Sequence, residues 1–284
     1  MTRFIAIAAC LVATAAFAGE DPARWYLRMD NDFFFHTDRW YTSGVRLARV
    51  KDGWEWGLAQ DIYTPEAKYE SPTLQDRAPT ARLLASVAKH VVGEATFDTF
   101  QIDAGVRGPS ALGEQAQDAA HRIVDSGVKL YWDRQLPDEF DGSVIAVRTL
   151  SLPANLRTHF GAVIGNQVSF AHLGIEWRIG EAASPSSALM RFAATPPFAG
   201  NAQGWSAFLG ASARGVARNE LLSKNYYVYG PELEKKNEVT RLTGGIAWSR
   251  RWGDLEIDLA QDSREFVGQR AAHAFGSVAL HVNF

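Results

Sequence analysis

The sequence lacks several features that would narrow its function at once. Its 284 residues contain a single cysteine, Cys10, which falls in a segment that we predict to be removed. We therefore expect the mature chain to have no disulfide, no thiol catalysis and no cysteine-based zinc site. A nucleophile elbow, a phosphate-binding loop, an H-E-x-x-H helix and a dinucleotide fingerprint are missing as well.

An excess of one charge and long apolar runs are equally scarce. The 29 basic and 32 acidic residues leave a net charge of −3, and no basic tract indicates nucleic acid as a partner. Mean hydropathy is −0.17, and no apolar run after residue 18 is long enough for a membrane-spanning helix. Soluble proteins and β-barrels remain, because a barrel strand needs only every second residue to be apolar.

The first residues have the pattern of a secretory signal peptide. A short start with Arg3 precedes an alanine-rich apolar stretch at 5–17, and Ala16-Phe17-Ala18 fits the small-x-small cleavage pattern. We therefore predict a signal peptide at 1–18. The mature chain, 19–284, contains no internal repeat and no linker, so we predict a single domain there.

The mature chain is rich in short segments in which apolar and polar residues alternate. In the clearest of them, at 255–259, a two-residue period places Leu and Ile on one face and Glu256 and Asp258 on the other. The segment at 277–284, which ends on Phe284, alternates in the same way and resembles the C-terminal signal of bacterial outer-membrane barrels. Charged residues between large apolar ones fit a polar lumen and a lipid-facing exterior better than a soluble sandwich.

Thirteen segments qualify as strands. They lie at 24–31, 40–50, 54–62, 81–90, 97–107, 143–151, 156–164, 170–179, 204–214, 218–229, 238–249, 254–264 and 273–284. An outer-membrane barrel with both chain ends on one side needs an even number of strands. We therefore predict an all-β, 12-stranded antiparallel outer-membrane barrel, and expect the error to lie at 218–229 or at a boundary near 150.

The stretches between the strands differ in length. Those at 63–80, 108–142 and 180–203 are longer than the turns expected on the periplasmic side. Apolar residues recur at helical spacing across 111–124, after Ser110 near a proline, which predicts a helix there. A helix in an extracellular loop is an unusual addition to a barrel, and it therefore marks a candidate site.

Two polar clusters are not required by strand formation or lipid contact. In the first, at 30–44, the adjacent Asn31 and Asp32 either form a turn or supply oxygen ligands at the barrel rim. The second surrounds the predicted helix and includes His121, which is either structural or a base that activates water beside a bound substrate. Lys68 lies between the clusters, and the sequence alone favours a solvated loop charge there.

Several short motifs follow one another in a distinctive order. They are YLRMDND, TDRWYTSG, QDIYTP, DRAPTA, GPSALGEQAQDAAHRI and YWDRQLPDE, followed by SREF and GSVALHVNF. Together they resemble the outer-membrane lipid A 3′-O-deacylase family over essentially the whole mature chain, with QDIYTP and AHRI the most specific pieces. The resemblance implies a 12-stranded barrel whose active site lies on the extracellular side, between the barrel wall and a loop helix.

The resemblance also implies which residues act. The essential polar residues of the family fall on Asn31, Asp32, Thr42, Lys68 and His121. The family uses a divalent cation, usually Ca²⁺, for which Asp32 is an expected ligand. A further acidic ligand would fall near Gly127, which has no side chain, so Asp125 or Glu139 is expected to replace it.

The resemblance thus implies a metal-dependent ester hydrolase that removes a 3′-O-linked acyloxyacyl group from lipid A, the membrane anchor of lipopolysaccharide. His121 would deprotonate the attacking water, and the cation would stabilise the oxyanion. Asn31 and Asp32 would hold the cation or orient the water, while Thr42 and Lys68 would position the ester or a phosphate. Two alternatives stay open: a non-enzymatic barrel, such as a porin or structural protein, and an inactive member of the family.

Overall fold

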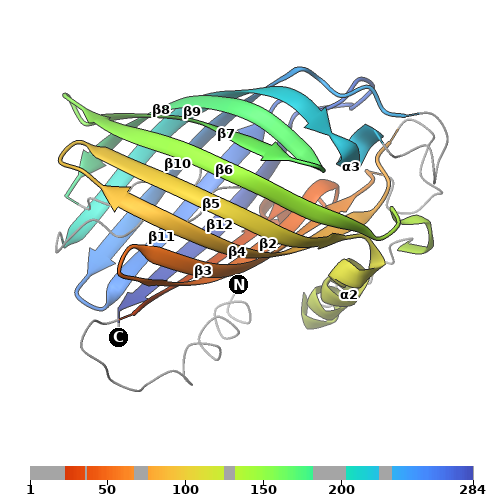
Figure 1. Cartoon of the computed structure of the whole chain (residues 1–284), viewed down its shortest axis with the longest axis horizontal. Coiled ribbons are helices and arrows are strands. Elements are labelled where there is room, and N and C mark those ends of the chain that lie inside the picture. The colour runs from red at the N-terminus through yellow and green to blue at the C-terminus, as the bar shows by residue number, and fades with distance from the viewer. Residues whose placement is uncertain are drawn as a thin grey trace.

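The computed structural model describes residues 23–35, 37–66, 76–124, 132–181, 203–223 and 232–283. Twelve strands form a closed antiparallel barrel, in which each strand pairs with its neighbours in sequence and β1 also pairs with β12 (Figure 1). The predicted 12-stranded antiparallel barrel is confirmed. The predicted signal peptide at 1–18 and Phe284 lie outside the described residues.

The strands are 8 to 16 residues long. They are β1 (Arg24–Asn31), β2 (Trp40–Lys51), β3 (Trp54–Thr64), β4 (Thr80–Val92), β5 (Thr96–Arg107), β6 (Glu139–Leu152), β7 (Leu156–Gly165), β8 (Val168–Gly180), β9 (Gly204–Asn219), β10 (Glu238–Arg250), β11 (Gly253–Asp262) and β12 (His273–Asn283). The helical segments are η1 (Asp32–Phe35), η2 (Pro109–Ala111), α2 (Gly113–Val124), η3 (Trp132–Arg134) and α3 (Glu220–Ser223).

The strand candidate at 218–229 is wrong. β9 continues to Asn219, and the chain then forms the short helix α3, while residues 224–229 lie outside the described part. The physical reason lies in two adjacent leucines. Leu221 and Leu222 are both buried, in two different apolar clusters. In a strand they would point to opposite faces of the barrel, whereas a helical turn lets both enter the core.

The barrel reverses the usual distribution of residues between inside and outside. In β11, Glu256 and Asp258 face the lumen and are buried, whereas Ile257 and Leu259 are 40% and 50% exposed on the outer surface. Apolar side chains on that surface are stable in lipid, which is what the alternation in the sequence predicts. Among the described residues, no helix is long and apolar enough to span a bilayer.

Charged side chains fill the interior by pairing across strands that are not neighbours in the sheet. Arg28 of β1 lies 3.4 Å from Asp258 of β11, and Arg178 of β8 lies 3.8 Å from Glu256 of β11. Since isolating one buried charge costs several kcal/mol, each needs such a partner. The polar residues of the strands therefore form a packed interior.

The two ends of the barrel carry different connections. Short hairpins join β2 to β3, β4 to β5, β6 to β7 and β10 to β11 at the end where Arg24 pairs with Asn283. The opposite end carries η1, α2 and α3, and long loops of this kind are extracellular in outer-membrane barrels (Figure 1). The stretch at 180–203 departs from our expectation: despite its length it joins β8 to β9 at the short-hairpin end, because antiparallel order alone decides the side.

Candidate functional site

The predicted loop helix folds back against the outside of the barrel. It was expected at 111–124 and spans Gly113–Val124 as α2 (Figure 1). Beneath it, Ile62 of β3 and Ala81 of β4 pack with Ala111 and Trp132 in one apolar cluster. Gly113 permits the close approach, because a Cβ there would lie 2.4 Å from the Cβ of Ala81. The helix therefore covers the outer wall at the extracellular end.

The rim segment between β1 and β2 is organised by the two predicted residues Asn31 and Asp32. Asn31 Oδ1 accepts a hydrogen bond from the Phe33 backbone N–H at 2.7 Å, which begins the 3₁₀ turn η1. Asp32 is buried, and its Oδ2 accepts from Thr37 Oγ1 at 2.8 Å and from the Arg39 backbone N–H at 2.9 Å. Both side chains thus shape the loop, and Asp32 holds the residues on either side of Asp38.

Asp38 joins this rim segment to the loop helix. Its Oδ2 lies 3.3 Å from Nε2 of His121, and its Oδ1 accepts from Gln117 Nε2 at 2.9 Å. Gln117 Oε1 in turn accepts from the Trp132 indole N–H at 3.0 Å. The side chains of His121 and Asp38 keep 19% and 10% of their surface exposed. The result is a histidine–carboxylate pair that is fixed by neighbours yet accessible from outside the barrel.

Aromatic side chains of the same rim segment face the surroundings of the barrel. Phe33, Phe34 and Phe35 of η1 are 53%, 44% and 40% exposed. The Phe34 ring packs against the barrel wall over Gly276 of β12. A Cβ added at Gly276 would lie only 2.6 Å from that ring. Aromatic residues are enriched where a membrane protein meets the lipid–water interface. The loop that carries Asp32 and Asp38 therefore borders lipid.

Thr42 lies at a β-bulge of β2, between Tyr41 and Ser43. It is buried, and its Oγ1 is 2.6 Å from Oγ1 of Thr64 in β3. This contact ties Thr42 to the barrel wall at the extracellular end. The structure thus links Asp32 to His121 through the segment 37–39, and places Thr42 on the strand that follows. Lys68 lies outside the described residues.

Of the three predicted cation ligands, Asp32 and Glu139 lie among the described residues, and each contacts other partners. Glu139, at the start of β6, lies 2.8 Å from Arg107 Nη2 and accepts a hydrogen bond from Gln167, so it neutralises a buried arginine. Asp32 binds its own loop, and Asp125 lies outside the described residues. No group of three His, Cys, Asp or Glu side chains suited to a metal ion occurs among the described residues. The calcium site stays a prediction.

Two residues of the site were not singled out from the sequence. Asp38 was one of many polar residues in the first cluster, and nothing local distinguishes it from a turn residue. Gln117 precedes His121 by four positions on α2, a spacing that places both on one face of a helix. That spacing was the available signal, and it would have identified Gln117 as a neighbour of the histidine.

Comparisons with known proteins agree with this fold. A family model described as "Outer membrane protein LpxR" matches residues 4–54 and 48–284. The chain belongs to the LpxR outer membrane protein family. The resemblance that the sequence motifs indicated is thereby confirmed, and so is the location of the barrel in the bacterial outer membrane.

Among solved structures, LpxR from Salmonella typhimurium matches this LpxR-family chain with a TM-score of 0.77 and 19% identity. The match covers 92% of this chain and 100% of that one. The β-domain of the Bordetella autotransporter Brka gives a TM-score of 0.41 at 11% identity, covering 94% and 100% of the two chains. A comparison with curated proteins returned no match.

Proposed function

We propose that this LpxR-family barrel hydrolyses an acyl ester of lipid A, the 3′-O-linked acyloxyacyl group, in the outer leaflet of the outer membrane. The Asp38–His121 pair carries the proposal, because it is held on the outer wall beside a loop that borders lipid. A base oriented by a carboxylate is the arrangement by which many hydrolases activate a nucleophile. Family membership supports a protein related to lipid A.

In the proposed mechanism, His121 acts as the general base. When Nε2–H donates to Asp38, Nδ1 is the ring nitrogen that accepts the proton of the attacking water. Asp38 fixes the ring orientation and stabilises the imidazolium that forms. Gln117 holds the second oxygen of Asp38, so the carboxylate cannot rotate away. The base must be neutral to accept a proton, so we expect deacylation to fall at acidic pH.

The other predicted residues have supporting roles in this proposal. Asp32 positions Asp38 by binding the residues on both sides of it, and Asn31 sets the turn that precedes it. Thr42 and Lys68 position the ester or a glucosamine phosphate, for which a lysine is suited as a point charge. A divalent cation, expected from the family resemblance, would polarise the ester carbonyl when bound.

A porin function has less support. Ion pairs such as Arg178–Glu256 cross the interior between strands that are not neighbours in the sheet, and twelve strands enclose a space that side chains can largely fill. A channel would also have no use for a histidine–carboxylate pair on its outer wall.

The test is to incubate purified protein with lipid A in detergent micelles, with calcium, and to analyse the products by mass spectrometry. We expect a mass loss that corresponds to one acyloxyacyl group, and fragmentation should assign it to the 3′ position. Unchanged lipid A after prolonged incubation would contradict the proposed function and favour an inactive family member.

A further inference from the structure

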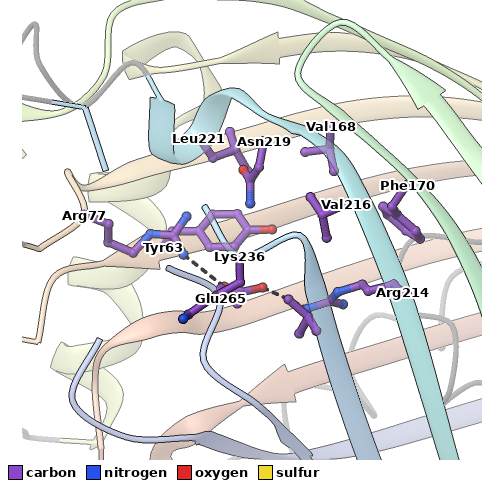
Figure 2. Close-up of a pocket in the computed structure, with 11 residues that line it drawn as sticks. Tyr63, Arg77, Val168, Phe170, Arg214, Val216, Asn219, Leu221, Lys236 and Glu265 are labelled. Carbon is purple, nitrogen blue, oxygen red and sulfur yellow. Dashed lines mark hydrogen bonds and ion pairs between the residues drawn. The ribbon is translucent and has the colours of Figure 1, made fainter. Parts of the chain in front are cut away.

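A polar recess lies inside the mouth of the barrel, at the extracellular end. Its walls come from β3, β8, β9 and β10 and from the connections that follow β3, β9 and β11 (Figure 2). Tyr63 forms part of the lining, whereas the preceding residue, Ile62, packs beneath α2. The barrel wall therefore separates this recess from the Asp38–His121 pair.

Arg77 is the first of three cationic side chains in the recess. It is buried, its guanidinium lies 4.3 Å from the centre of the Tyr63 ring, and its Nη1 lies 3.5 Å from Glu265 Oε2. Its neighbour Asp76 accepts the backbone N–H groups of Glu66 and Arg77, and burial raises the pKa of Asp76. The arginine is thus held rigidly with its plane against an aromatic face.

Arg214, the second cation, approaches the same carboxylate from β9. Its Nη2 lies 2.9 Å from Glu265 Oε1 and 3.1 Å from Asp262 Oδ2 (Figure 2 shows the contact with Glu265). Asp262 is shared, because Arg241 binds both of its oxygens at 2.6 and 2.8 Å. Glu265 therefore pairs with two arginines, Arg77 and Arg214, whereas Asp262 is bound mainly by Arg241.

Lys236 is the third lining cation and the one nearest solvent. Its backbone N–H donates to the Glu265 carbonyl at 2.7 Å, which keeps the two residues adjacent, and its side chain is exposed. Among the described lining residues, three are cationic, Arg77, Arg214 and Lys236, and one is acidic, Glu265. The recess carries an excess of positive charge over its own acidic group.

We propose that this recess binds a phosphate group that enters from the extracellular mouth of the barrel. Guanidinium groups bind such anions through paired N–H donors, and a lysine at the entrance adds a point charge. Apolar neighbours such as Val168, Phe170 and Val216 reduce the local dielectric and strengthen the attraction. Free phosphate and the phosphate of an outer-surface sugar share this chemistry.

The experiment measures binding by isothermal titration calorimetry on the full-length barrel in uncharged detergent at low ionic strength. The probes are inorganic phosphate, glucose 6-phosphate and, as an uncharged reference, glucose. We expect both anions to bind and glucose not to bind. Similar affinities for the two anions would identify free phosphate as a sufficient ligand, and tighter binding of glucose 6-phosphate would identify a sugar phosphate as the source.

Adjacent lysines supply a matched control. Lys236→Gln removes the cation at the recess and should weaken phosphate binding about three- to tenfold, since one charge-assisted contact is lost. Lys235→Gln removes the same charge, but Lys235 Nζ binds the Val216 carbonyl and Asn237 Oδ1 instead, so binding should be unchanged. Heat-modifiable electrophoretic migration verifies that each variant is a folded barrel.

A second pair of variants probes the arginines. Arg214→Gln should weaken binding more than Lys236→Gln does, whereas Arg218→Gln, on the same strand, should have no effect because Arg218 pairs with Glu220 on the exposed rim. Absence of binding by either anion, or equal weakening by Lys235→Gln and Lys236→Gln, would overturn the proposal. Because binding is measured directly, the result does not depend on whether the barrel deacylates lipid A.

Discussion

Two histidine–carboxylate pairs among the described residues differ in their surroundings. His90 Nε2 lies 3.0 Å from Glu55, its Nδ1 lies 3.0 Å from Thr99 Oγ1, and the side chains of the pair are 1% and 0% exposed. His121 Nε2 lies 3.3 Å from Asp38 on the outer wall, where both side chains remain partly exposed. The first pair connects β3, β4 and β5 inside the barrel. The same chemical pair is thus structural where both ring nitrogens are enclosed, and available for chemistry where a water can reach it.

The strongest test of this contrast replaces each histidine by glutamine, which keeps hydrogen bonding but cannot act as the base. His121→Gln should lower the deacylation rate about 10²–10⁴-fold, the usual contribution of general-base catalysis, with the melting temperature unchanged. His90→Gln should leave the rate within about twofold because the site is distant. It should cost about 1–3 kcal/mol of stability, since the buried Glu55 carboxylate loses one of its two charged partners and keeps only Arg46. Equal rates for His121→Gln and wild type would show that the outer pair has no catalytic role.

Removing divalent cations with a chelator tests whether the Asp38–His121 pair supports deacylation without a metal ion. From the family resemblance we expect EDTA to abolish deacylation of detergent-solubilised lipid A, and added calcium to restore it. Asp32→Ala should be partly rescued by excess calcium if its defect is weak cation binding, whereas His121→Gln should not be rescued, because no cation replaces a base. Full activity of the wild type in EDTA would remove the cation from the mechanism and leave the histidine–carboxylate pair in place.

Substitution of the acidic partners, Asp38 and Glu55, tests the same contrast between the two pairs. Asp38→Asn should lower the catalytic rate about 10²-fold with little change in KM, because the amide stabilises a different ring tautomer and no imidazolium. The matched change inside the barrel, Glu55→Gln, should alter thermal stability and not the rate. Steady-state kinetics and thermal unfolding of both variants test these expectations. If Asp38→Asn changed only KM, Asp38 would act in substrate binding and not in catalysis.

The smallest expected effect concerns how closely α2 sits against the wall. Gly113→Ala introduces a Cβ that would lie 2.4 Å from Ala81 and 2.7 Å from Trp132, so the helix must shift. We expect a rate about tenfold lower, because a displaced base is poorly aligned. Gly215→Ala is the control, since no atom lies within 4 Å of a Cβ there. An active Gly113→Ala variant would mean that the site tolerates movement of the helix.

Much of the fold was predictable because it rests on local periodicity. In β11 the alternation of Glu256 and Asp258 with Ile257 and Leu259 specifies a lumen face and a lipid face, and the structure has both. The helix of the long loop was recognisable from its apolar spacing. The candidate at 218–229 failed because burial of two adjacent leucines, a tertiary effect, outweighed the strand pattern.

The sequence by itself determined the barrel and the presence of His121 on a loop helix, because each follows from a repeating pattern or a short motif, whereas the even number of strands follows from barrel closure. The tertiary structure alone decided which acid His121 meets. Asp38 and Gln117 are 79 positions apart, and they touch only because barrel closure brings two loops to the same end and α2 folds onto the outer wall. The tertiary structure likewise decided which histidine–carboxylate pair is exposed to water, since this depends on the side of the barrel wall on which each pair lies.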